Sequence, residues 1–112
     1  MPMFQSPSID NPVLAEIVRR LVPLYHPDRI YLFGSAVRGA AGPDSDYDIM
    51  IVVPDETPAE VRESNEVYQV LWGIGVPIDV LVWTRGDFDG RLHLKASLPA
   101  TILREGRLLY GA

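Results

Sequence analysis

The sequence contains no cysteine among its 112 residues, so disulfide bonds, thiolate metal ligands and thiol catalysis are all excluded. It has no apolar run near the roughly 20 residues that are needed to span a bilayer. Its first five residues, MPMFQ, lack the basic segment followed by an apolar stretch that marks a signal peptide. We therefore expect a cytoplasmic protein.

Positive charge is also scarce. Ten Lys and Arg residues stand against fifteen Asp and Glu, which gives a net charge of −5, and only Arg19 and Arg20 are adjacent in the sequence. Proteins that hold long nucleic acids normally carry a basic stripe, so extended DNA or RNA is not the expected partner. A small phosphorylated ligand remains compatible with this charge, because bound cations can supply what the side chains do not.

The length fits one domain, residues 1–112, with a single modest core. Helical patterns follow typical start signals. Asn11 and Pro12 resemble a cap followed by proline at the first helical position, and Thr57 and Glu60 have the spacing of a capping box. The expected helices cover residues 12–22, 57–73, 86–95 and 97–105, with a short helix after Gly34 running to about Arg38.

Three apolar segments are predicted to be strands: 29–33, 47–53 and 77–83. The second is β-branched and apolar after Asp48, as expected of a strand that is buried on both faces. Residues 107–110 are compatible with a last short strand. The order predicts an α/β (α+β) domain, in which a small mixed sheet of three core strands is flanked by helices.

The chemistry concentrates where the first two strands meet the intervening loop. A Gly34-Ser35 pair closes the first strand, and ten residues later Asp46 and Asp48 open the second. Side chains two apart on a strand point to the same face, and paired carboxylates repel each other unless a cation lies between them. Magnesium accepts one or two carboxylates plus substrate phosphates. The alternative is that Asp46 and Asp48 are solvated turn residues.

The third strand adds a carboxylate to this picture. Asp79 lies within an otherwise apolar run, and a lone buried carboxylate is costly unless it is paired or liganded. If the third strand lies beside the second, Asp79 completes a three-carboxylate cluster. The alternatives are that Asp79 pairs with an arginine such as Arg38, or that it lies at an exposed strand end just after Pro77.

Gly34 and Ser35 complement the carboxylates. Glycine lets a phosphate approach the backbone closely, the start of a helix favours negative charge, and the serine adds a hydroxyl donor. Arg38 falls one helical turn later, where its guanidinium could reach a phosphate. Together these residues predict a site for a nucleoside triphosphate with its magnesium.

The pattern of Gly34-Ser35, ten residues, and Asp46-Tyr47-Asp48 resembles the defining motif of the polymerase-beta-type nucleotidyltransferase superfamily. The short chain, the GSAVRG segment at 34–39 and the ending at 102–110 are similar to its minimal nucleotidyltransferase (MNT) branch. The resemblance implies transfer of AMP from ATP to a hydroxyl, with two Mg²⁺ ions as cofactors. It implies that Asp46, Asp48 and Asp79 bind metal and that Asp79 is also the general base. Gly34 and Ser35 would hold the triphosphate, and Arg38 would support it.

The acceptor is expected to lie on another protein, because the chain stops at Ala112 with little material for an acceptor pocket. Proteins that resemble this one are paired with a helical HEPN-domain toxin. The resemblance implies adenylylation of a tyrosine on that toxin, so that the chain acts as a type VII-like antitoxin. Two alternatives stay open: a non-catalytic antitoxin that masks its partner by binding, and an adenylyltransferase for small molecules such as antibiotics.

Overall fold

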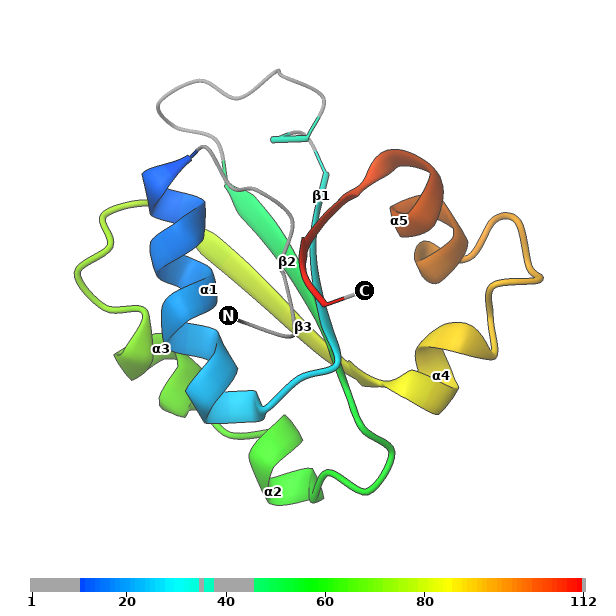
Figure 1. Ribbon diagram of the computed structural model, residues 1–112, viewed down its shortest axis with the longest axis horizontal. Helices are drawn as coiled ribbons and strands as arrows, with labels where there is room; N and C mark the ends of the chain where they lie inside the picture. Colours follow the sequence, from blue (N-terminus) through cyan, green and yellow to red (C-terminus); the bar gives the residue numbers. More distant parts are fainter. Residues whose placement is uncertain (1–10, 35, 38–45, 112) are drawn as a thin grey trace, which may run out of the picture.

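The computed structural model describes residues 11–34, 36, 37 and 46–111. These residues form five helices and four strands (Figure 1). In chain order they are α1 (Pro12–Tyr25), β1 (Arg29–Phe33), β2 (Tyr47–Val53), α2 (Ala59–Arg62), α3 (Glu66–Val70), β3 (Ile78–Thr84), α4 (Arg85–Asp89), α5 (Leu98–Glu105) and β4 (Arg107–Tyr110).

The strands form one mixed sheet in the order β3-β2-β1-β4. β1 is antiparallel to both β2 and β4, whereas β2 and β3 are parallel. The predicted mixed sheet flanked by helices is confirmed, and the short segment 107–110 joins it as a fourth strand at the edge beyond β1. The α2–α3 region is the crossover that a parallel β2–β3 pair requires.

Helices cover both faces of the sheet (Figure 1). On one face α1 and α3 pack against alternate strand residues such as Ile49, Ile51 and Val53, all fully buried. On the other face Met50 and Val52 contact Phe88 of α4 and Ile102 of α5. β2 is therefore buried on both faces from Ile49 onward, as predicted, and its position is fixed by the core.

Helix α1 extends further than predicted. Asn11 caps it by accepting hydrogen bonds from the amides of Val13 and Leu14, as expected from the sequence. The helix was predicted to end near Pro23, but it continues to Tyr25 and ends at His26, whose φ of 48° lies in the left-handed region. The prediction was wrong because Tyr25 is buried in the core, and this burial favours the last turn despite the proline.

The predicted single helix over 57–73 is also wrong. The segment forms two short helices, α2 and α3, and no side chain caps α2. The backbone turns at Ser64, whose hydroxyl accepts a hydrogen bond from the amide of Glu66 and so starts α3. Likewise, helix α4 covers only part of the predicted 86–95 segment, which otherwise forms turns, whereas α5 confirms the helix predicted for 97–105.

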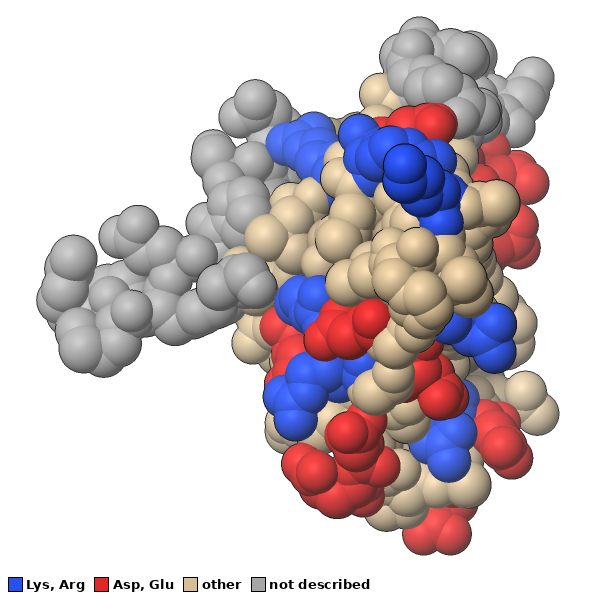
Figure 2. Space-filling view, turned by 90° about the vertical axis from the view of Figure 1, so that its right-hand side faces the viewer, with Lys and Arg blue, Asp and Glu red and all other residues tan. Residues whose placement is uncertain are grey.

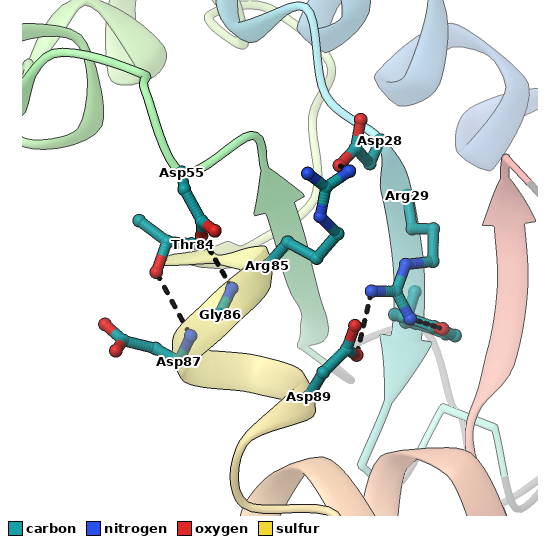
Figure 3. A network of polar contacts seen from close by, with 9 residues as sticks. Asp28, Arg29, Asp55, Thr84, Arg85, Gly86, Asp87 and Asp89 are labelled. Carbon is teal, nitrogen blue, oxygen red and sulfur yellow. Dashed lines mark hydrogen bonds and ion pairs between the residues drawn. The ribbon is translucent and has the colours of Figure 1, made fainter.

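A polar network attaches α4 to the start of β1 and to the turn that follows β2 (Figure 3). The Arg29 guanidinium donates to Asp89 at 2.9 Å and lies 5.3 Å from the ring centroid of Phe88. Asp55 accepts a 2.7 Å hydrogen bond from the amide of Gly86, and Thr84 caps the helix by accepting from the amide of Asp87. These contacts hold α4 over the sheet at the end opposite to Asp48 and Asp79.

No helix within the described ranges is both long and apolar enough to cross a membrane.

Candidate active site

Three chain segments meet at one end of the sheet. β1 ends there with Phe33, and β2 and β3 both begin there. Phe33 lies opposite Asp48 in the antiparallel β1–β2 pair, so Gly34, the next residue, lies against the start of β2. The sheet topology therefore brings together the two parts of the sequence motif that the loop after Gly34 separates.

Asp48 and Asp79 are register partners in the parallel β2–β3 pair. Residues that are paired in this way point to the same face of a sheet. Asp48 alternates with Met50 and Val52, which contact α4 and α5, so both carboxylates lie on the face that these helices cover further along the strands. The condition that the sequence left open is met: the third strand lies beside the second, so Asp48 and Asp79 are side by side.

The carboxyl of Asp48 is the electrostatic centre of the cluster. Burial raises its pKa above the ordinary value, and the negative charges of Asp79 and then Asp46 raise it further. Asp46 is exposed just before β2, whereas Asp48 is half-buried at its start. Asp79 and Asp46 thus both lie within electrostatic range of Asp48, an arrangement that a shared cation would stabilise.

Gly34 is fitted to Asp48. Its φ is +82°, a conformation that side chains of L-residues rarely adopt. A Cβ at this position would also collide with Oδ2 of Asp48. Only glycine therefore allows the chain to turn here while the carboxylate of Asp48 lies directly over the backbone.

Ser35 and Arg38, the other predicted nucleotide-binding residues, lie outside the described residues. The amide of Val37 donates a 3.3 Å hydrogen bond to the carbonyl of Gly34, so the chain makes a turn directly after β1. The short helix that was predicted to run to about Arg38 is described only at Ala36 and Val37, which form this turn.

One argument for a metal site was wrong. Asp79 was expected to be buried in an apolar strand, but β3 is an edge strand and Asp79 is exposed. Its charge is solvated, so burial alone does not require a ligand for it, and the alternative of an exposed strand end after Pro77 describes its surroundings. The interest of Asp79 comes from its pairing with Asp48.

The donor set suits a hard cation but is not assembled into a complete site. Within the ranges that the structure describes, no three His, Cys, Asp or Glu side chains are gathered closely enough to hold a metal ion. Carboxylate oxygens are nevertheless the ligands that Mg²⁺ prefers, and Mg²⁺ is commonly held by one or two carboxylates together with substrate phosphates. The residues therefore fit an ion that arrives with its nucleotide.

Tyr47, between Asp46 and Asp48, faces the opposite side of the sheet from Asp48. It packs on the α1 side, and its hydroxyl accepts a 3.1 Å hydrogen bond from the side-chain amide (Nδ2) of Asn11. Two aromatic residues on this side are exposed: Tyr68 on α3 by 62%, and Trp72, just after α3, by 82%.

Acidic and basic side chains are interspersed on the face shown in Figure 2, and Asp and Glu gather toward its lower part. On α5, the exposed Arg104 donates a hydrogen bond from its guanidinium to the backbone carbonyl of Lys95. This face carries mixed charge instead of a continuous basic stripe.

Comparison with solved structures shows that the fold is known. A crystal structure of a toxin-antitoxin with AMP-PNP has a TM-score of 0.61 and 24% identity, over 88% of this chain and 73% of that chain. A mutant of the toxin-antitoxin MntA-HpeT with two Asp-to-Glu changes has a TM-score of 0.58 and 21% identity, with the same coverage of 88% and 73%. An inferred nucleotidyltransferase from Sulfolobus solfataricus has a TM-score of 0.50 and 28% identity, over 69% of each chain.

At the level of sequence, no curated protein was found to match. The family model described as nucleotidyltransferase domain, however, matches residues 12–109. This range includes Gly34, Asp46, Asp48 and Asp79 and nearly all of the chain. The protein therefore belongs to the nucleotidyltransferase domain family, as its sequence motif predicted.

Proposed function

We propose that this nucleotidyltransferase is Mg²⁺-dependent and moves AMP from ATP to a hydroxyl on a partner protein, and that residues 1–112 form its one catalytic domain. The observation that carries the proposal is the position of Asp48. Its half-buried carboxylate lies over Gly34, opposite Asp79, and its pKa is raised by burial first and then by the charges of Asp79 and Asp46. No described side chain supplies a cation to this cluster. A cation bound with a substrate would relieve the repulsion.

Gly34 would allow the triphosphate to approach the backbone after β1, where the chain turns. Ser35 would donate its hydroxyl to a phosphate oxygen, and Arg38 would add a guanidinium. These roles follow from the motif. Their test is direct, because removal of the Arg38 charge should weaken binding of the triphosphate more than that of AMP.

In this proposal two Mg²⁺ ions would be held by Asp46, Asp48 and Asp79. When bound, the metal neutralises phosphate charge and lowers the barrier to phosphoryl-group transfer. The oxygen of the acceptor hydroxyl forms a bond to the α-phosphorus of ATP, and the bond from that phosphorus to pyrophosphate breaks. In this proposal Asp79 would take the proton that the hydroxyl loses, a role supported by its exposed position beside Asp48.

We further propose that the acceptor is a tyrosine of a HEPN-domain toxin and that the chain is its antitoxin. Two of the structural neighbours are toxin-antitoxin proteins, one of them with AMP-PNP. The other carries its Asp-to-Glu changes at two positions two residues apart, the same spacing as Asp46 and Asp48. Cytoplasmic location is part of this proposal, because ATP is available there.

The first experiment needs no partner. Isothermal titration with AMP-PNP should show binding that depends on Mg²⁺ in the wild type and is lost in Asp48→Asn. Glu60→Gln is the matched control, since Glu60 is exposed on α2, away from the aspartates. Equal binding by Asp48→Asn and the wild type would contradict the proposed site.

The second experiment tests the acceptor. The chain is incubated with the protein encoded by the neighbouring reading frame, Mg²⁺ and ATP labelled at the α-phosphate. Label should appear on a tyrosine of the partner, and Asp46→Asn and Asp48→Asn should abolish it. Complete inhibition of the partner without ATP would show masking by binding instead. Label on an aminoglycoside and none on the protein would identify a small-molecule enzyme.

A further inference from the structure

Strand β3 forms an edge of the sheet and pairs only with β2 in the described part of the chain (Figure 1). Its pairing with β2 is regular over all seven residues, and the last five, Val80–Thr84, carry no charge. Soluble proteins usually protect such an edge with charged residues, proline or a bulge. An unprotected edge is a template on which another strand can pair.

The side chains along this edge are apolar and partly exposed. Leu81, at the middle of β3, is 40% exposed, and Tyr68 of α3 is 62% exposed. Both line a cavity of about 230 Å³ beside the strand, together with Val80 and Val82. The edge therefore has an apolar centre that an added strand would remove from water.

The two ends of the edge carry opposite charge. Asp79 is exposed near the start of β3. At the other end Arg62 and Arg91 line a second cavity of about 150 Å³ with Trp83, and the Arg91 guanidinium lies 5.8 Å from the Trp83 ring centroid.

These two arginines differ from Arg19, Arg20, Arg29 and Arg85, which form ion pairs. Arg62 donates to the carbonyl of Thr57, and among the described residues neither Arg62 nor Arg91 forms an ion pair with a carboxylate. Asp87 also lines the cavity and supplies the one carboxylate there, so the lining has an excess of positive charge.

We infer that this edge binds the same edge of a second copy of the chain, with the two β3 strands antiparallel and Leu81 at the two-fold axis. In this register Asp79 lies opposite Trp83 of the second copy. Directly opposite side chains have Cβ atoms about 4.5–5.5 Å apart and share a face. The carboxylate of Asp79 therefore reaches the cavity that Arg62 and Arg91 of the second copy line.

A second copy fits because the edge is complementary to itself. The apolar centres of the two copies meet, and the acidic end of each copy meets the basic end of the other. Such an isologous contact is the usual basis of a two-fold dimer. It also brings Arg91 of the second copy beside Asp79 of the candidate active site. The inference does not depend on the proposed function, since it rests on the strand edge and its charges.

Sedimentation of the full chain over a range of concentrations tests the inference. The wild type should form a dimer, and Leu81→Lys should raise its dissociation constant by at least about tenfold, because it places two charges at the two-fold axis. Leu103→Lys is the matched control, since Leu103 is 49% exposed on α5, a helix that packs against β1, and β2 separates β1 from β3 in the sheet. Circular dichroism checks that both variants fold.

A charge exchange tests the register. Asp79→Arg and Arg91→Glu should each weaken self-association, because like charges then meet at both ends. An equimolar mixture of the two variants should dimerise again, since every acidic position then faces a basic one. A wild type that stays monomeric, a Leu103→Lys variant that is weakened as much as Leu81→Lys, or a mixture that stays monomeric would each overturn the inference.

Discussion

Asp48 and Asp79 lie directly opposite each other on parallel strands, although the whole α2–α3 crossover separates them along the chain. Their pairing is a property of the sheet register. A shift of one residue in β3 would turn Asp79 to the opposite face and place Ile78 or Val80 beside Asp48. The candidate site therefore depends on the core residues that fix the register, especially those of the fully buried part of β2.

Gly34→Ala should destabilise the protein by about 1–3 kcal/mol, because it combines a positive φ with a collision at the Asp48 carboxylate. Gly73→Ala is the matched control. Gly73 has a similar φ of +87° but nothing within 4 Å of an added Cβ. Urea unfolding of both variants separates the two effects. In an Asp48→Ala background the two glycine substitutions should cost about the same, and an unchanged difference would refute the collision.

Asp48→Asn should stabilise the fold at neutral pH. The folded-state pKa of Asp48 is raised by burial, Asp79 and Asp46, so protonation of Asp48 favours the folded state. The contribution of this protonation to the free energy of unfolding is fully present only at pH values below the unfolded pKa. That contribution is lost as the pH rises through the folded pKa. The stability gain of Asn over Asp should therefore be present at pH 7 and vanish near pH 3. Thermal unfolding at both pH values, with Glu60→Gln as the control, measures it.

Magnesium and nucleotide together should raise the thermal midpoint of the wild type more than either alone. The described carboxylates do not form a complete metal site, so the phosphates must supply further ligands. Asp46→Asn and Asp48→Asn should lose this joint effect. A full shift with magnesium alone would show that the ion has a preformed site, and a shift with nucleotide alone would show that the aspartates hold no metal.

Arg29→Ala should cost about 1–3 kcal/mol, since it removes an ion pair, a hydrogen bond to the Tyr31 hydroxyl and the contact with Phe88. The Arg29 side chain is only 16% exposed. Arg85→Ala is the matched control, because Arg85 pairs with Asp28 at the same 2.9 Å distance but is 50% exposed. An exposed pair contributes little, so its loss should be near zero in chemical unfolding. Equal losses would argue against a structural role for the Arg29 network.

Much of the site end of the molecule could be predicted from the sequence because its signals are local. A glycine that closes an apolar run, and aspartates that open the next, mark strand ends without knowledge of the rest of the fold. The three core strands and the family were predicted correctly for this reason, whereas the pairing of β2 with β3 entered only as a condition. The roles of Ser35 and Arg38 stay predictions.

The failures arose where tertiary packing decides. Pro23 is tolerated within α1 because Tyr25 is buried beyond it, and a single sequence does not reveal that burial. The break between α2 and α3 is accompanied by a local hydrogen bond from the amide of Glu66 to the Ser64 hydroxyl, in a segment whose apolar spacing also fits one helix. The exposure of Asp79 followed from the edge position of β3, since a short apolar run has the same composition at an edge as at the centre of a sheet.

The direction of the strands has one further consequence. β1 ends at the aspartates while β2 and β3 begin there, so the β2–β3 connection departs from the opposite end of the sheet and returns by way of α2 and α3. The turn at Asp55 and Glu56, which opens this connection, is thus remote from Asp48 and Asp79. A reporter group attached at the exposed Glu56 should follow folding and assembly without entering the chemistry, which makes this position suited to a label or an immobilising link.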